Sequence, residues 1–337
     1  MKVDYCLTGQ LDDRELVVAV EAHGFDGAWM PELTHDPFPI LAIAATRTTT
    51  IELGTAITVA FARNPMTMAV LGNDLQTYSS GRFLLGIGSQ VKQHITRRFS
   101  MPWSAPADRM REYLQAVRAI WRCWETGERL QFSGEFYSHT LMTPYFNPGP
   151  NPFGNPALIL ASVGPRMTRV AGELADGLFV HAFTTERYVR EVTLPALREG
   201  RVAADKDDSL SGFEVCGSPM IVTGADDEQM ANAEAAIRSQ IAFYASTPTY
   251  RPLLQLHGWA DIGEELTAMS KNGQWAKMGQ LVNDDMLDAF AIVAKPADVA
   301  SRIHQRFGDV FTRTSFLAPY GLPDHFWAPI TAELQTL

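Results

Sequence analysis

Short β-rich runs alternate with helical runs along almost the whole of this 337-residue chain. The β-rich runs occupy residues 2–7, 27–30, 51–59, 82–87, 157–161, 177–181, 213–222 and 314–319. The helical patterns occupy residues 12–23, 37–47, 65–78, 107–124, 165–175, 185–204, 226–244 and 296–307. Such alternation predicts a parallel sheet with helical crossovers. Eight repeats without an internal linker predict one domain over residues 1–337, an α/β fold of the (β/α)₈ TIM barrel type.

Three long segments interrupt this alternation of strands and helices, at residues 89–106, 126–156 and 246–294. We interpret them as insertions after strands 4 and 7 of the barrel. Residues 130–137 are typical of a hairpin arm, whereas 246–294 is mixed and mostly helical. The aromatic residues of the helix at 107–124 recur every three or four positions, which favours packing on the barrel over a ligand site.

Charge and composition exclude some classes of partner. The chain has 38 acidic and 28 basic side chains, a net charge of −10, which argues against a nucleic-acid partner because phosphates require a basic surface. Its three cysteines, Cys6, Cys123 and Cys216, are far apart and lack metal-ligand spacing, which favours a reducing compartment. No apolar stretch approaches the ~20 residues that span a bilayer, and residues 1–4 carry no cleavage signal. We expect a soluble cytoplasmic protein without a membrane partner.

Polar residues follow several predicted strands, at the end where TIM barrels carry their active sites. Glu32 and His35 come directly after strand two, so that one of them can transfer a proton while the other orients it. His181 ends strand six and is the alternative proton carrier. No His-x-His or His-Glu-x-x-His pattern is present, so we expect no metal site.

Two glycine-containing turns could bind a phosphate. Gly86-Ile87-Gly88 lacks the third glycine of a dinucleotide fingerprint, because Val91 stands there, so a Rossmann site is disfavoured. Residues 162–165, Ser-Val-Gly-Pro, join a strand end to a helix start, where free backbone N–H groups and the helix dipole favour a phosphate. An ordinary N-terminal turn of the helix is the alternative, and the sequence leaves both open.

A long ordered pattern carries a family resemblance. It begins with Ile-Glu-Leu-Gly-Thr-Ala-Ile at 51–57, continues with Ala-Arg-Asn-Pro at 62–65, and ends with Ser-Ser-Gly-Arg-Phe-Leu-Leu-Gly-Ile-Gly at 79–88. Ala-Asp-Gly at 175–177 and Lys-Pro-Ala-Asp-Val at 295–299 are weaker matches. Together these segments resemble the bacterial luciferase-like monooxygenase family over nearly the whole chain.

The resemblance implies a barrel that holds a flavin or deazaflavin ring against a bulge in strand three. The family commonly has a non-proline cis peptide after its Gly-Thr, which here would join Ala56 to Ile57 and press on one face of the ring. The resemblance also implies that the cofactor phosphate is held at the helix start after strand five, with part of the loop after strand four close by. The residues concerned are Ser162, Val163, Gly164 and Met167, together with Ser89 and Gln90.

Two departures from the family pattern bear on the cofactor and the chemistry. Many deazaflavin-dependent relatives carry Asp-His after strand two, whereas here Leu33 follows Glu32 and the histidine is His35. The luciferase branch places an arginine near the position of Ser89 to hold the FMN phosphate, and this chain has none there. The second departure favours the deazaflavin coenzyme F-420 over FMN.

The resemblance therefore implies a deazaflavin-dependent oxidoreductase that transfers a hydride between coenzyme F-420 and a small organic substrate. Two alternatives stay open, an FMN-dependent two-component monooxygenase with a separate cofactor reductase, and a non-catalytic flavin-binding member of the same fold. We expect a homodimer or a higher homo-oligomer.

Overall fold

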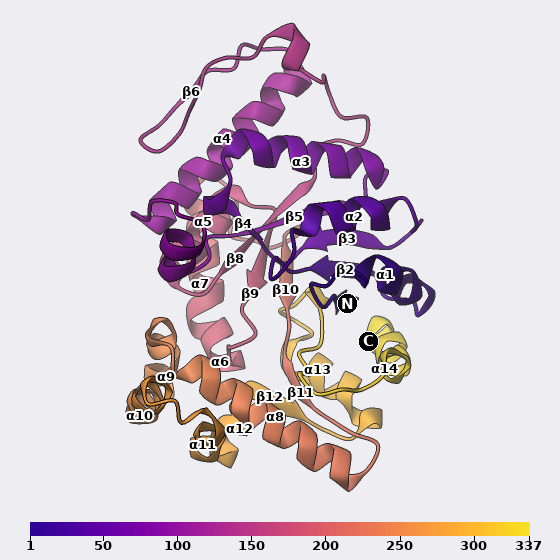
Figure 1. Cartoon of the computed structure of the whole chain (residues 1–337), viewed down its shortest axis with the longest axis vertical. Helices are drawn as coiled ribbons and strands as arrows, with labels where there is room; N and C mark the ends of the chain where they lie inside the picture. The colour runs from indigo at the N-terminus through magenta and orange to yellow at the C-terminus, as the bar shows by residue number, and fades with distance from the viewer. The chain divides into compact units, whose positions relative to one another are not determined.

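The structure is a computed structural model that describes residues 1–323 and 325–337 in full and residue 324 by its backbone. The chain divides into two compact units. The first, called the N-unit, comprises Asp4–Phe179 and Ala196–Glu214. The second, called the C-unit, comprises Met1–Val3, Val180–Pro195 and Val215–Leu337. In Figure 1 the N-unit is mostly indigo to magenta, and the insertion helices of the C-unit are orange.

Parallel strands form a closed barrel in which the third strand is split into two pieces. The strand order is β3-β2-β1-β13-β10-β9-β8-β5-β4, and β3 also pairs with β5, so the sheet closes on itself. The strands are β1 (Lys2–Cys6), β2 (Gly27–Met30), β3 (Glu52–Thr55), β4 (Thr58–Val59), β5 (Phe83–Gly88), β8 (Ala157–Ser162), β9 (Gly177–Val180), β10 (Glu214–Gly217) and β13 (Arg313–Thr314). Because β3 and β4 together correspond to one predicted strand, the predicted (β/α)₈ barrel is confirmed.

The N-unit helices begin where the sequence supplies a cap or a proline. They are α1 (Asp13–Ala22), α2 (Pro37–Ala45), α3 (Pro65–Tyr78), α4 (Pro106–Thr126), α5 (Pro165–Leu174) and most of α7 (Leu194–Ala203). The Asp36 side chain accepts a hydrogen bond from the Phe38 N–H, and Asn64 does the same for Thr67. Proline suits the first helical turn, because its missing donor would have no partner there.

The most specific sequence motif serves mainly to close the barrel. The Arg82 guanidinium donates hydrogen bonds to the carbonyl oxygens of Ile51 and Thr48, at 2.6 and 3.0 Å, and so ties β5 to the start of the neighbouring strand. At Gly86 a Cβ atom would lie 1.7 Å from the Thr55 carbonyl oxygen, so only glycine lets β3 approach β5. This part of the family pattern is therefore structural.

The insertion after the fourth barrel strand contains α4 and a short antiparallel hairpin. The hairpin strands are β6 (Phe132–Ser133) and β7 (Ser138–His139), flanked by the helical turns η2 (His94–Arg98) and η3 (Pro144–Phe146), while η1 (Ala60–Ala62) follows β4. Glu112 of α4 accepts hydrogen bonds from the Glu135 and Phe136 backbone N–H groups. These bonds hold the predicted hairpin arm on the helix.

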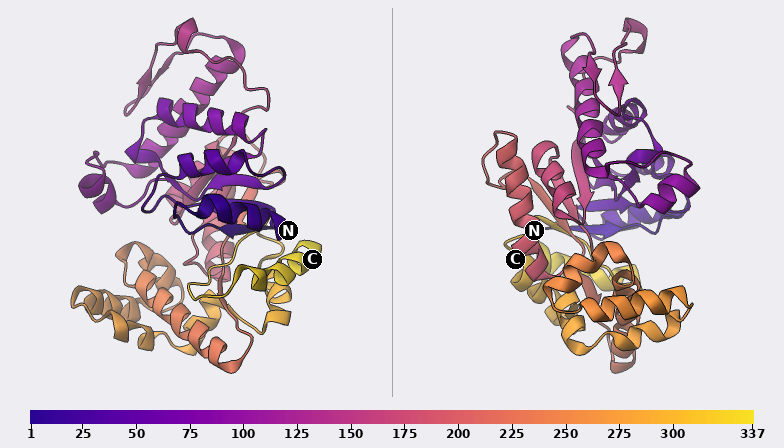
Figure 2. Two further views of the ribbon diagram at one scale, coloured as in Figure 1. Left: turned by 45° about the vertical axis from the view of Figure 1, so that its right-hand side comes forward. Right: turned by 90° about the vertical axis from the view of Figure 1, so that its left-hand side faces the viewer.

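The insertion after the seventh barrel strand builds a helical layer within the C-unit. Its helices α8 to α12 lie together in both views of Figure 2 and share a buried apolar core. The C-unit helices and turns are α6 (Glu186–Tyr188), η4 (Val189–Thr193), α8 (Asp227–Ala245), η5 (Pro248–Tyr250), α9 (Arg251–Leu256), α10 (Ala260–Lys271), α11 (Trp275–Met278), η6 (Gly279–Leu281), α12 (Asp284–Phe290), η7 (Pro296–Asp298), α13 (Val299–Phe307) and α14 (Asp324–Thr336). None of the described helices is both long and apolar enough to cross a bilayer.

The C-unit departs from the sequence prediction in three places. The strand predicted at 213–222 breaks at Pro219, which cannot donate to a ladder, and its second half, β11 (Met220–Val222), pairs with β12 (Ala291–Val293) outside the barrel. β12 lies in the segment expected to be mostly helical. Of the strand predicted at 314–319 only Thr314 lies in the barrel, in β13 (Arg313–Thr314), and the helix α14 after it had no counterpart in the prediction.

Candidate active site

Glu32 is a buried carboxylate at the end of β2. Its Oε2 atom accepts three hydrogen bonds, from Thr58 Oγ1 at 2.9 Å, the Val59 N–H at 2.8 Å and Arg63 Nη1 at 2.7 Å. The Glu32 side chain is only 6% exposed, and Arg63 is 14% exposed. A carboxylate oxygen that accepts three donors, one of them a guanidinium, has the geometry of the ionised form.

Arg63 connects this carboxylate to the loop that carries His35. Its Nη2 atom lies 2.6 Å from Asp36 Oδ2, and Asp36 is also the N-cap of α2. Burial alone would lower the pKa of Arg63, but the hydrogen bonds and charges of Glu32 and Asp36 outweigh that effect and raise it. We call Glu32, Asp36, Thr58, Val59 and Arg63 the Glu32 cluster. Sequence reasoning missed Arg63 as a site residue, although it stands in the Arg-x-Pro motif that the family resemblance used.

His35 lies half-buried in the loop between β2 and α2. No hydrogen bond or ion pair joins it to Glu32 among the described side chains, and the partner that orients Glu32 is Arg63. The expected pairing of Glu32 with His35 is therefore not formed in this structure. The acid–base role of each residue stays a prediction.

The predicted cis peptide is present between Ala56 and Ile57, at the break between β3 and β4. The Ala56 N–H donates to the Met30 carbonyl at 2.9 Å, and the Ile57 carbonyl accepts from the Glu32 N–H at 3.4 Å. Both side chains are half-buried. This confirms the backbone geometry, while contact with a cofactor ring stays a prediction.

Ser89 and Gln90 directly follow β5. Gln90 has a φ of 60°, in the left-handed region, and its Oε1 accepts a hydrogen bond from the Val91 N–H. The Ser89 hydroxyl donates to the Gln90 carbonyl at 3.1 Å. Both side chains are half-buried at the C-terminal end of the strand, where they were predicted to lie near a cofactor.

The predicted phosphate site is the start of α5. Gly164 is the N-cap residue, no side chain caps the helix, and a Cβ atom at Gly164 would meet nothing within 4 Å. The Ser162 hydroxyl lies 2.7 Å from the Thr168 hydroxyl, which itself donates to the Gly164 carbonyl, so Ser162 donates to Thr168. Val163 and Met167 are half-buried. The helix start is open, whereas the Ser162 hydroxyl already has a partner.

His181 directly follows β9 and belongs to the C-unit. Its Nδ1 accepts a hydrogen bond from the Phe183 N–H at 3.0 Å, and its Nε2 lies 3.0 Å from the Tyr250 hydroxyl. The rings of Tyr244 and Tyr250 both lie 5.0 Å from the imidazole, centroid to centroid. Desolvation by this packing lowers the pKa of His181 to about 4. We call His181, Phe183, Tyr244 and Tyr250 the His181 cluster. Sequence reasoning missed Tyr250, because nothing in segment 246–294 ties it to strand six.

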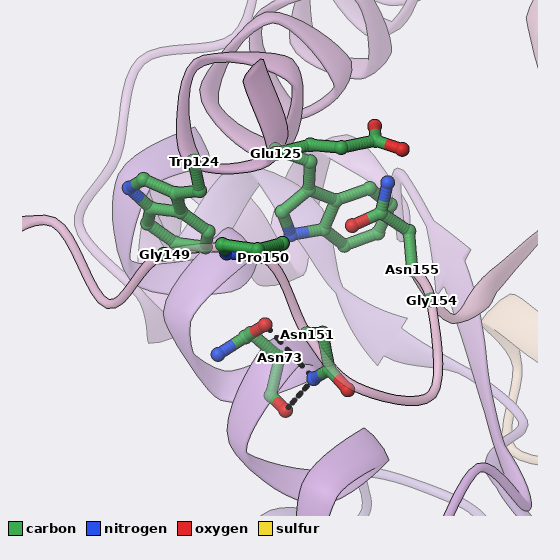
Figure 3. A pocket seen from close by; sticks show the side chains of 9 residues that line it. Asn73, Trp124, Glu125, Gly149, Pro150, Asn151, Gly154 and Asn155 are labelled. Atoms are coloured by element: carbon green, nitrogen blue, oxygen red, sulfur yellow. Dashed lines mark hydrogen bonds between the residues drawn. The ribbon is translucent and has the colours of Figure 1, made fainter. Parts of the chain in front are cut away.

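A hollow of about 50 Å³ lies elsewhere in the N-unit, between α3, α4 and the loop that precedes β8. Figure 3 shows Asn73 and Asn151 at this hollow, where the Asn151 side-chain amide donates to the backbone and side-chain oxygens of Asn73. It lies at the N-terminal end of β8, and that end of a TIM barrel serves stability. None of the predicted site residues lines it. Within the described residues, no three His, Cys, Asp or Glu side chains gather to hold a metal ion.

Comparison with known proteins agrees with this architecture. A family model described as luciferase-like monooxygenase matches residues 12–313. The chain is 49% identical over 314 residues to the uncharacterized protein Rv1360 of Mycobacterium tuberculosis, which covers 93% of this chain and 92% of that one. It is 28% identical over 298 residues to the 5,10-methylenetetrahydromethanopterin reductase of Archaeoglobus fulgidus, covering 86% of this chain and 84% of the reductase.

Among solved structures, the coenzyme F-420-dependent tetrahydromethanopterin reductase of Methanopyrus kandleri matches with a TM-score of 0.78 and 21% identity. The match covers 99% of this chain and 96% of that chain. At this identity the likeness supports the fold.

Proposed function

Because the chain belongs to the luciferase-like monooxygenase family, as its motifs predicted, we propose that it is an oxidoreductase that uses coenzyme F-420 to transfer a hydride to or from a small organic substrate. The similarity to a methylenetetrahydromethanopterin reductase over most of both chains supports this choice. The observation that carries it within the molecule is the Glu32 cluster, a buried ion pair at strand ends beside the Ala56–Ile57 peptide.

The residues present fit a flavin-like cofactor with a phosphate. The start of α5 is uncapped and has open space over Gly164, so the backbone N–H groups of its first turn are suited to a phosphate. Ala56 and Ile57 are half-buried rather than covered, which leaves a surface for a flat ring. When bound, coenzyme F-420 gives or accepts a hydride and needs no oxygen.

The chain's own residues would manage charge and protons. When a hydride adds to a carbonyl carbon, the electron pair of the C=O bond moves to oxygen, which must then take a proton. Glu32 would remain an anion, because Arg63, Thr58 and Val59 all donate to its Oε2. His35 would supply the proton in reduction and accept it in oxidation, directly or through water.

The experiment that tests this function is anaerobic turnover with reduced coenzyme F-420 and a panel of small carbonyl and imine compounds. We expect oxidation of the cofactor that depends on both enzyme and substrate. Oxidation only with oxygen, reduced FMN and a separate reductase would instead support the second candidate, a two-component monooxygenase. The description of the matched family favours that candidate.

A further inference from the structure

The hydrogen bonds of His181 fix where its proton lies. The Phe183 backbone N–H is only a donor, so Nδ1 of His181 must be the unprotonated nitrogen. A neutral imidazole then carries its proton on Nε2. It follows that Nε2–H donates to the Tyr250 hydroxyl oxygen across the 3.0 Å contact.

This assignment leaves the hydroxyl hydrogen of Tyr250 without an acceptor. Among the described residues, the Tyr250 hydroxyl makes no hydrogen bond besides the one from His181. Burial raises the pKa of Tyr250 well above its usual range, so the phenol keeps its hydrogen at any physiological pH. Tyr250 is therefore a neutral donor, and the His181 N–H fixes the orientation of its oxygen.

The rings that pack against this pair are uncharged. Phe183 lies 5.2 Å from Tyr250, and Tyr244 lies 5.0 Å from His181, both measured between ring centroids. Phe290 stacks on Phe183, whose backbone N–H donates to His181, with 4.4 Å between the two ring centroids. Because burying an unpaired charge is costly, such surroundings favour an uncharged ligand over a carboxylate or a phosphate.

We propose that Tyr250 donates a hydrogen bond to the carbonyl oxygen or imine nitrogen of an uncharged substrate, and that His181 is the positioning residue that holds it. This rests on the proposed function. His181 directly follows β9, at the end of the barrel where chemistry occurs in this fold, and Tyr250 is bonded to it. As the hydride reaches the substrate carbon, negative charge grows on the atom that accepts the Tyr250 hydrogen bond, and a fixed donor stabilises that charge.

Turnover of two tyrosine variants tests the donor. With the whole enzyme, coenzyme F-420 and an uncharged ketone such as cyclohexanone or acetophenone, Tyr250→Phe should lower kcat about 100-fold, the usual loss when one such donor is removed. Its affinity for the cofactor should be unchanged. The matched control Tyr145→Phe, which removes the hydroxyl of an exposed tyrosine in the N-unit turn η3, should keep near-full activity. Equal activity of Tyr250→Phe and wild type would overturn the proposal, as would a preference for para-carboxyacetophenone over acetophenone.

Two variants of His181 separate positioning from packing. The side-chain amide of asparagine is separated from Cβ by the same number of bonds as Nδ1 of histidine. The side-chain amide of glutamine is separated from Cβ by the same number of bonds as Nε2 of histidine. His181→Gln can therefore still donate to Tyr250, whereas His181→Asn retains only the acceptor for Phe183. We expect His181→Gln to retain most of kcat and His181→Asn to lose as much as Tyr250→Phe. Equal losses in both variants would indicate a merely structural histidine and overturn the positioning role.

A measurement without cofactor distinguishes failure of this inference from failure of the proposed function. Nitrogen-15 NMR of the free enzyme should show His181 with its proton on Nε2, and Tyr250→Phe should shift that nitrogen alone. A proton on Nδ1 would overturn the inference even if coenzyme F-420 is the cofactor. If the NMR result holds but no ketone is turned over with coenzyme F-420, the proposed function fails, and the donor role in that reaction fails with it.

Discussion

The Glu32 cluster and the His181 cluster both follow barrel strands, yet one is built on charge and the other on neutral rings. At Glu32, a guanidinium and two further donors surround one carboxylate oxygen. At His181, a backbone N–H and a phenol use both ring nitrogens, and desolvation lowers the pKa of the imidazole to about 4. The Glu32 cluster therefore retains a buried charge, whereas the His181 cluster excludes one.

This difference determines what each cluster would do in the proposed hydride transfer. The Glu32 carboxylate oxygen accepts three hydrogen bonds, and a histidine that stays neutral at pH 7 is a poor source of protons. We therefore propose the half-buried His35 as the proton carrier.

The largest expected effect follows from removal of Arg63. Arg63→Met leaves the Glu32 carboxylate buried without its counter-charge, which typically costs about 3–5 kcal/mol of unfolding free energy. Urea unfolding measures this loss. The double variant Glu32→Gln with Arg63→Met removes both charges and should recover most of it. If the single and double variants were equally unstable, the ion pair would not be what stabilises this cluster.

The second prediction concerns turnover. Glu32→Gln keeps an oxygen for the Arg63 hydrogen bond but removes the negative charge, and His35→Ala removes the proposed proton carrier. We expect each to lower kcat at least ~100-fold: His35→Ala because a placed acid–base group contributes about a hundred- to ten-thousand-fold, and Glu32→Gln because it leaves the Arg63 charge without its buried counter-charge. Cofactor affinity, measured by titration, should change little. Near-full turnover in both variants would move the proton chemistry to His181, to His94 at the start of the turn η2, or to a bound water.

The third prediction uses the depressed pKa of His181. The unfolded chain protonates this histidine near pH 6.5, whereas the folded protein does so only near pH 4. Between these two pKa values the unfolded state binds more protons than the folded state. The His181 contribution to the free energy of unfolding is therefore complete above pH 6.5 and is lost as the pH falls toward about 4. The loss approaches about 3 kcal/mol, at about 1.4 kcal/mol per pKa unit.

Other carboxyl groups also titrate in this interval, so the test is a difference. Urea unfolding of wild type and His181→Gln at about pH 7 and about pH 4.5 isolates the histidine contribution. The variant should lose less stability on acidification. Equal losses would show that His181 does not stay neutral in the folded protein.

The smallest expected effect is at Asp36, on the exposed side of the Glu32 cluster. Asp36→Asn keeps the acceptor that caps α2 and removes only the charge that faces Arg63. Because Asp36 is 49% exposed, this bridge should contribute under about 1 kcal/mol. Asp36→Ala should cost about 1 kcal/mol more through the lost cap. A large loss for Asp36→Asn would place the main counter-charge of Arg63 at Asp36 rather than Glu32.

The barrel was predictable because its signals are local. Strand and helix periods, the prolines at helix starts and the Gly-Thr motif at 54–55 act over a few residues, and the structure follows them through the N-unit. The C-unit was harder to predict from the sequence, because its short strands β11 and β12 pair across nearly seventy intervening residues. Pro219 also stands just before β11. A pairing of that kind leaves no local pattern.

Only some residues of the candidate site could be predicted from the sequence, for the same reason. Glu32, His35 and His181 stand directly after strands, so position alone indicated them. Arg63 and Tyr250 reach their partners from segments 31 and 69 residues away in the chain. The family motif contained Arg63, but its link to Glu32 required coordinates, and Tyr250 had no motif at all.

Equilibrium titration of the purified protein with coenzyme F-420 and with FMN shows directly which of the two cofactors the chain prefers. Both ligands can be followed by their fluorescence under identical conditions. We expect saturable binding of coenzyme F-420, with FMN bound at least about tenfold more weakly, a difference of about 1.4 kcal/mol. Tighter binding of FMN than of coenzyme F-420 would contradict the deazaflavin assignment and leave the barrel and its family membership intact.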